Sequence, residues 1–151
     1  MKLIIKIIVV SLLIISCKKE ANNSTINEST IIIKYGTYSG WCVGNDSLTI
    51  SLNNLLYGKY YPCDKVQIFK QSMISSEENN ELINSLDSLE FKKLVLNSSN
   101  VSFDGTDYWI SVKNGSYYHK IRYGAGDTLS IRNIILFVRL LDKQKEKFLN
   151  K

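Results

Sequence analysis

The chain has little of what enzyme sites and metal centres are usually built from. Its only histidine is His119, and its sequence contains no zinc-ligand spacing, no phosphate-binding loop and no paired-carboxylate motif. Asp104, Thr106 and Asp107 could offer oxygen ligands to calcium, but a solvated turn capped by its own aspartates is the favoured interpretation. Because a general base near neutral pH is most often a histidine, these absences favour a binding protein over an enzyme. We expect no cofactor and no metal.

Clusters of positive charge are also missing, although basic residues exceed acidic ones. The formal net charge is +5, but there is no arginine cluster and no glycine-rich basic stripe of the kind that nucleic-acid binding needs. Nucleic acid is therefore not an expected partner.

Long hydrophobic runs are absent, apart from a short one at the start. Residues 7–15 are apolar except for Ser11, follow Lys2 and Lys6, and end at the small residue Ser16. A bilayer requires roughly 20 apolar residues, so this run is too short to cross one. A positive segment, an apolar stretch and a small residue before a cleavage point are typical of a signal peptide, here residues 1–16.

The end of this signal resembles the lipobox of bacterial lipoproteins. Ile14, Ile15 and Ser16 precede Cys17, which matches two aliphatic residues, a small residue and cysteine. The resemblance implies that the Cys17 sulfur carries a diacylglycerol and that the mature chain begins there, with an acyl chain such as palmitate on its new amino group. The alternative is an ordinary secretory peptide in which Cys17 has no role.

The lipoprotein resemblance also implies a location. The chain would be held in the bacterial cell envelope through its N-terminal lipid, facing the periplasm or the cell surface. By analogy with known lipoproteins, Lys18 rather than an aspartate after the anchor favours the outer membrane. Residues 17–30 are then the lipidated cysteine and a polar, flexible tether that spans roughly 20 Å. Residues 31–151 have the length of a single domain.

Two further cysteines, Cys42 and Cys63, remain in this domain. In an exported protein, an even number of remaining cysteines indicates a disulfide, which would stabilise the fold by roughly 3 kcal/mol. One alternative is a reactive Cys42 with His119 as its base, and another is a metal-binding pair.

Hydrophobic patterning predicts the elements of the domain. Strands are expected at residues 31–36, 47–52 and 65–70, with Leu48, Ile50 and Leu52 on one face. Residues 106–124 form the clearest predicted hairpin, with a type I′ turn at Asn114-Gly115. In its second strand, one face is expected to carry Tyr117, His119, Ile121 and Tyr123, and the other Tyr118, Lys120 and Arg122.

Helices are expected in three places. Ser75 and Glu78 have the spacing of a capping box, a short helix contains Phe91, and Asp127 or Ser130 caps the last helix. These elements predict an α+β domain: an antiparallel sheet of about five strands with two or three helices packed on one face.

The most unusual segment of the domain is YGTYSGWCVGND, residues 35–46. It is similar to the signature Tyr-Gly-Thr-x-x-Gly-x-Cys-x-Gly of small uncharacterised bacterial secreted and lipoprotein domains. Those relatives commonly have a further cysteine where this chain has Asn45-Asp46, and the resemblance implies no known activity. The matching residues are Tyr35, Gly36, Thr37, Gly40, Cys42 and Gly44.

The candidate binding residues are Tyr38, Trp41 and Asn45 in this segment and Tyr118 in the predicted hairpin. Tyrosine and tryptophan rings serve recognition surfaces and cores alike, so core packing is the alternative role for them.

The function expected from the sequence is that of a membrane-anchored lipoprotein whose domain binds a protein, a glycan or an envelope component without catalysis. One alternative is a thiol-dependent or other hydrolase that uses Cys42 and His119. Another is an inhibitor or immunity lipoprotein that binds a toxin or a lytic enzyme.

Overall fold

The computed structural model describes residues 31–100 and 105–149 of the chain. The predicted signal peptide, the lipidation site at Cys17 and the tether lie outside the described residues, and so does Asp104.

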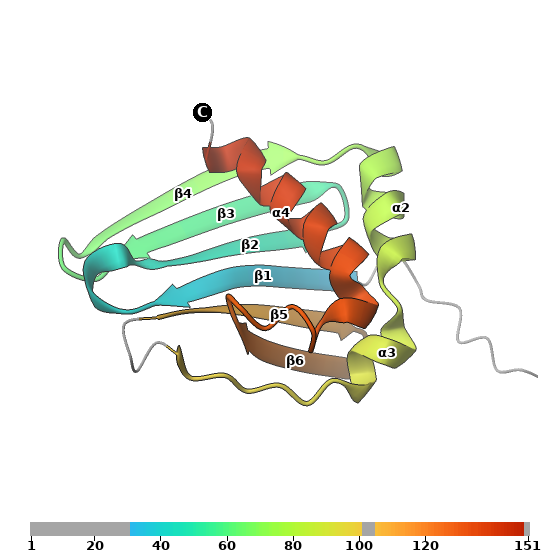
Figure 1. Cartoon of the computed structure of the whole chain (residues 1–151). Coiled ribbons are helices and arrows are strands. Elements are labelled where there is room, and N and C mark those ends of the chain that lie inside the picture. The colour runs from blue at the N-terminus through green and yellow to red at the C-terminus, as the bar shows by residue number, and fades with distance from the viewer. Residues whose placement is uncertain (1–30, 101–104, 150–151) are drawn as a thin grey trace, which may run out of the picture.

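Six antiparallel strands form one sheet in the order β4-β3-β2-β1-β5-β6 (Figure 1). The first four strands make a meander, and the last two make a hairpin that adds to the free side of β1. The central strand β1 therefore pairs on both sides. The strands are β1 (Ile31–Ser39), β2 (Asn45–Ser51), β3 (Asn54–Tyr61), β4 (Val66–Met73), β5 (Thr106–Asn114) and β6 (Tyr117–Gly124).

Within the described residues, three α-helices accompany the sheet, which confirms the predicted α+β class. Helix α4 (Ile135–Leu149) crosses one face of the sheet, while α2 (Ser76–Ser85) and α3 (Ser88–Lys93) lie near one end of the strands (Figure 1). Short 3-10 helices occur at Trp41–Val43 (η2) and Arg132–Ile134 (η4). The sheet has one strand more than expected, because β3 was not predicted.

The hydrophobic core fills the space between the helices and the sheet face that α4 crosses. Every second residue of the central strands faces this side, and the ladders align these residues across the sheet. The main buried residues from the strands are Ile31, Ile33, Tyr35, Leu48, Ile50, Leu55, Tyr57, Ile110, Val112, Ile121 and Tyr123, and those from the helical side are Leu82, Phe91, Ile134, Phe137, Val138, Leu141 and Phe148.

Two turns differ from the prediction. Asn114 is the last residue of β5, so the hairpin turn is Gly115-Ser116. Only Gly115 of this pair has a positive φ, of 58°, which is the pattern of a type II′ turn rather than type I′. Leu52, which was expected to extend the inner face of β2, lies instead in the β2–β3 turn at φ 52° and is exposed.

The N-terminus of α2 agrees with the prediction, whereas the N-terminus of α4 differs from it. Ser75 and Glu78 form the expected capping box of α2. Neither Asp127 nor Ser130 caps α4, because the Ser130 hydroxyl donates to the Asp127 carboxylate and η4 leads directly into the helix.

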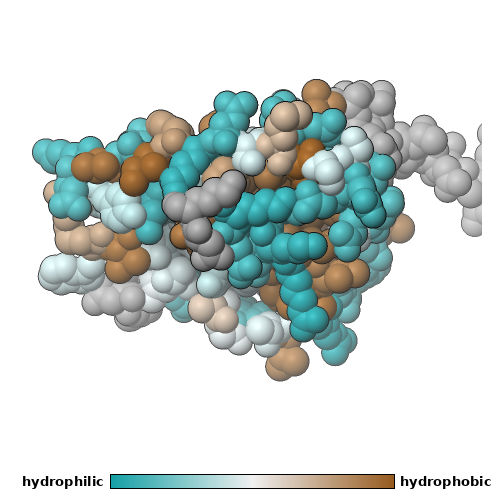
Figure 2. Space-filling model, turned by 90° about the horizontal axis from the view of Figure 1, so that it is seen from above, coloured by the Kyte–Doolittle hydropathy of each residue, from teal (hydrophilic) through white to brown (hydrophobic). Residues whose placement is uncertain are grey.

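Strand β4 is an edge strand whose side chains are exposed on both faces. Val66 and Ile68 lie on the helical side, whereas Phe69 and Met73 lie on the opposite side. Figure 2 shows hydrophobic residues at the surface among hydrophilic ones on the side of the molecule that carries this strand. None of the helices that the structure describes is long and apolar enough to cross a membrane.

Candidate functional site

The sheet face opposite α4, which we call the open face, is not covered by any of the described helices (Figure 1). Its two halves differ in character. Exposed apolar side chains such as Leu56 and Phe69 lie on β3 and β4, whereas Lys34, Lys113 and Lys120 lie on β1, β5 and β6. The open face therefore offers apolar contact on one side and positive charge on the other.

One row of residues crosses the open face from strand to strand. The ladders place Gly36 of β1 beside Ser47 of β2, and Ser47 beside Gly58 of β3. Trp109 of β5 and Phe69 of β4 stand at the two ends of this row. The result is a floor of small residues with an aromatic ring at each end.

Close neighbours, including the ring beside each one, explain both glycines. A Cβ atom on Gly36 would lie 2.9 Å from Cζ2 of Trp109 and would overlap the carbonyl oxygen of Asp46. A Cβ atom on Gly58 would lie 3.2 Å from Cε1 of Phe69. The rings therefore lie close against the glycines, while Ser47 between them stays partly exposed.

A cavity of about 230 Å³, which we call the slot, opens between these rings. Its charged lining residues, Asp46 and Lys59, pair with each other in the ladder and lie on the opposite face of the sheet, where the Asp46 carboxylate accepts from Lys145 Nζ at 2.7 Å. The polar groups left for a ligand are therefore uncharged. The slot is lined by Tyr38, Asn45, Asp46, Ser47, Gly58, Lys59, Tyr60, Gln67, Phe69 and Trp109.

Several uncharged polar groups around the slot are unpaired. Within the described part of the chain, neither the Ser47 hydroxyl nor the Gln67 side chain has a hydrogen-bond partner. Asn45 uses its Oδ1 to accept from the Ser39 amide at 3.1 Å, which leaves its amide nitrogen as a donor. The indole Nε1 of Trp109 is buried, and no described residue accepts its hydrogen. A buried donor of this kind costs about 1–3 kcal/mol when it is unpaired.

Tyr38 separates the slot from a second cavity. Its ring stacks on Trp109, with centroids 5.8 Å apart and planes 24° apart. Lys120 Nζ lies 4.9 Å from the Trp109 ring centre and donates to the Tyr38 hydroxyl at 3.3 Å, and the Arg122 guanidinium lies 5.1 Å from the Tyr38 ring centre. These cation–π contacts hold two positive charges beside the ring.

The second cavity, which we call the basic groove, has a volume of about 460 Å³. It combines an apolar wall from residues 94–96 with positive charge from β6. The residues that line it are Tyr38, Leu94, Val95, Leu96, Asn97, His119, Lys120, Ile121 and Arg122.

Arg122 is held in place by a buried carboxylate. Its Nη2 lies 2.6 Å from Oδ2 of Asp107. The other carboxylate oxygen, Oδ1, accepts from the Ser98 hydroxyl at 2.7 Å and from the Asn100 backbone amide at 3.2 Å. Burial alone would raise the pKa of Asp107, but these hydrogen bonds and the Arg122 charge outweigh it and hold the pKa below its usual value. The interpretation of Thr106 and Asp107 as a solvated turn was therefore wrong, because both belong to β5 and Asp107 is fully buried.

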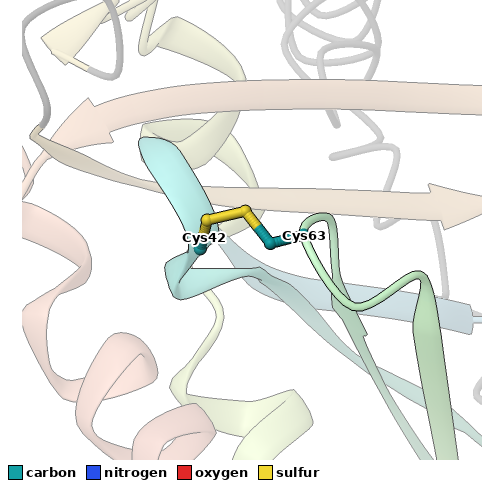
Figure 3. Close-up of a disulfide and its surroundings, with 2 residues drawn as sticks. All are labelled: Cys42 and Cys63. Carbon is teal, nitrogen blue, oxygen red and sulfur yellow. A yellow bond between two sulfur atoms is a disulfide. The ribbon is translucent and has the colours of Figure 1, made fainter.

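The predicted disulfide is confirmed. Cys42 of η2 and Cys63 of the β3–β4 turn are bonded, with Cα atoms 5.2 Å apart (Figure 3). The bond joins two connections at the end of the sheet where Tyr38 and Asn45 lie opposite each other on β1 and β2. It therefore braces the slot end of the open face.

The four candidate binding residues do not all come together. Tyr38 and Asn45 both line the slot. Trp41 is 79% exposed in η2, at a positive φ of 47°, and is not among the residues that line the slot. Tyr118 is 62% exposed on the open face, but it lies opposite Lys113, near the other end of the strands.

Four further residues that line the slot could not be predicted as site residues from the sequence: Ser47, Gly58, Gln67 and Phe69. Gly58 gave a usable signal, because a glycine inside a strand indicates a close approach by another group. The other residues gave none, because only the pairing of distant strands brings them together.

The structure does not assemble the alternative Cys42–His119 pair. Cys42 is bonded to Cys63, and His119 Nε2 lies 2.9 Å from the Leu94 carbonyl oxygen. His119 sits about six residues along the sheet from the end near Cys42, a separation of about 20 Å. In the parts of the chain that the structure describes, no three histidine, cysteine or acidic side chains gather as metal ligands.

Comparison of the chain with models of known protein families found no match, and comparison with curated protein sequences found none either.

Proposed function

We propose that this chain is a lipid-anchored protein of the bacterial envelope whose domain holds a partner on its open face. The observation that carries the binding role is the row of Gly36, Ser47 and Gly58, which leaves a slot between Trp109 and Phe69. Small residues in three adjacent strands add nothing to the core on the other side of the sheet. They do give a ligand access to unpaired polar groups between two rings.

The lipid anchor is supported by the resemblance of residues 14–17 to a lipobox, and the exported location is supported by the disulfide. Intact-mass measurement of the full chain expressed in a bacterium tests the anchor. We expect residues 1–16 to be removed and Cys17 to carry lipid, and we expect Cys17→Ser to lose the lipid. An unmodified Cys17 on a chain that retains residues 1–16 would contradict the anchor.

The binding role is tested with envelope fragments. The purified full-length product, kept in detergent, is incubated with immobilised cell-wall and outer-membrane fragments, and the retained protein is measured. We expect Phe69→Ala to reduce retention by about tenfold, because an exposed ring at the slot is lost. The matched control is Leu129→Ala, which removes an apolar side chain that is even more exposed and lies outside the open face. Equal retention of the two variants would remove the case for the open face as a binding site.

A further inference from the structure

The slot and the basic groove are neighbours on the open face, because Tyr38 lines both of them, and together they mark one path across it. The path runs from Phe69 and Gln67 on β4 to Arg122 on β6, across six strands. At about 4.8 Å between strands, its length is about 24 Å. A ligand that fills both cavities must therefore be an extended chain rather than a single small molecule.

The chemistry of the slot selects a neutral ring that carries hydrogen-bonding groups. Ser47 and Gln67 offer unpaired polar groups, and Phe69 and Tyr60 offer exposed rings. A purely apolar ligand would leave the polar groups unpaired, and a charged group would find no opposite charge there. Sugars combine apolar ring faces with many hydroxyls, and they therefore suit both features of the slot.

The chemistry of the basic groove selects negative charge. Among the described residues, Lys120 forms no ion pair with a carboxylate, and neither do Lys34 and Lys113 on the same face. Arg122 is the one cation of the open face that is paired, to Asp107, within the described ranges. The unpaired lysines give this side of the face a net positive field that attracts anions.

We infer that the open face binds an acidic polysaccharide, with one sugar ring in the slot and acidic groups of the same chain on Lys120 and its neighbouring lysines. This inference rests on the proposed binding role of the open face and names its ligand class. The acidic groups are carboxylate, sulfate or phosphate, which share the negative charge that the lysines recognise.

The test uses isothermal titration of the full-length product in detergent with polymers matched in length. Polygalacturonate supplies sugar rings with carboxylates, dextran sulfate supplies sugar rings with sulfates, and neutral dextran supplies rings alone. Poly-L-glutamate supplies carboxylates on a peptide. We expect at least one acidic polysaccharide to bind at least about tenfold more tightly than both neutral dextran and poly-L-glutamate.

Two variants assign this binding to the two cavities. Phe69→Ala and Lys120→Gln are each expected to weaken the binding of the acidic polysaccharide by about tenfold. Leu129→Ala and Lys92→Gln are the matched controls, because both side chains are exposed outside the open face. Circular dichroism and the thermal midpoint of each variant establish that the fold is intact.

The outcomes separate this inference from the proposed function. Equal affinity for poly-L-glutamate, or no affinity for any acidic polysaccharide, overturns the inference. If the envelope fragments are still retained in a Phe69-dependent manner, and periodate treatment of the fragments has no effect while protease abolishes retention, the partner is a protein and only the ligand class is wrong. If retention does not depend on Phe69, the proposed function fails as well.

Discussion

Trp109 lies against Gly36 on the neighbouring strand so closely that no side chain can be added to the glycine. The added Cβ would lie 2.9 Å from the indole and would overlap the Asp46 carbonyl oxygen of β2. Because one of these obstacles is backbone, a rotamer change of Trp109 cannot remove the overlap. The central strand must therefore move to accept any residue other than glycine.

The first prediction follows from this contact. Gly36→Ala is expected to lower the free energy of unfolding by about 3 kcal/mol, as overpacking does in a close-packed site. Gly126→Ala is the matched control, since a Cβ there would meet nothing within 4 Å, and it is expected to change stability little. Urea unfolding of both variants makes the comparison, and equal stability of the two would contradict the close packing described around Gly36.

The second prediction concerns the buried carboxylate of Asp107. Asp107→Asn keeps the shape of the side chain but removes the charge that Arg122 faces, so we expect the free energy of unfolding to fall by about 2 kcal/mol. Glu90→Gln, which removes the partly exposed carboxylate that pairs with Lys93 at the surface, is expected to have little effect. Equilibrium denaturation at pH 7 measures both changes.

The same carboxylate sets the acid limit of stability. The pKa of Asp107 is lower in the folded than in the unfolded chain, so its contribution is complete above the unfolded value of about 3.9 and is lost as the pH falls through the lower folded pKa. The thermal midpoint of the natural chain should therefore fall more steeply below pH 4 than that of Asp107→Asn. Parallel curves for the two proteins would show that Asp107 is not the group responsible.

The third prediction concerns alkaline pH. Burial, and then the nearby Asp46 charge, raise the pKa of Tyr57 to about 12. A raised pKa in the folded state gives stability that is present below the unfolded value of about 10 and is lost as the pH rises toward 12. Between pH 9 and pH 11 this loss amounts to about 1 kcal/mol for Tyr57.

Tyr57→Phe is the variant that checks this assignment. The Tyr57 hydroxyl is buried and has no hydrogen-bond partner among the described residues, so its removal should leave stability at pH 7 unchanged or slightly higher. The variant should also lose less stability than the natural chain between pH 9 and pH 11. An unchanged alkaline slope would assign the effect to other buried tyrosines, such as Tyr35 and Tyr123, whose pKa values are also raised by burial.

The fourth prediction concerns the disulfide. Its two cysteines are separated by 21 positions, and opening the loop between them is expected to lower the free energy of unfolding by about 3 kcal/mol. The double variant Cys42→Ser, Cys63→Ser should match the reduced natural chain in urea unfolding. If reduction has no effect on the midpoint, the bond does not constrain the unfolded chain.

Much of the fold could be predicted from local patterns in the sequence. The alternation in β6 correctly separated Ile121 and Tyr123, which face the core, from Lys120 and Arg122, which face the other side. Strand β3, which was not predicted, shows no such alternation. Its apolar and aromatic residues face both sides, because Leu55 and Tyr57 point to the core while Leu56 and Tyr60 lie on the open face, so no alternation is visible.

The candidate site could be predicted only in part, because the pairing of distant strands brings its residues together. Tyr38 and Asn45 were identified because an unusual glycine-rich segment contains both of them. Ser47 and Phe69 lie in ordinary strands, and nothing near them in the sequence indicates that they share a cavity. Their meeting depends on the registers of β2, β3 and β4, which are set by pairing between distant residues.

The central position of β1 also determines how the domain responds to mechanical load. Ile31 is the first residue that the structure describes, and the strand that starts there is hydrogen-bonded to β2 on one side and to β5 on the other. A pull on the chain ahead of Ile31 acts along this strand, so both ladders are loaded in shear and their bonds must break together rather than one after another. A domain pulled from this end would resist unfolding, because the force acts first on a strand that is hydrogen-bonded on both sides.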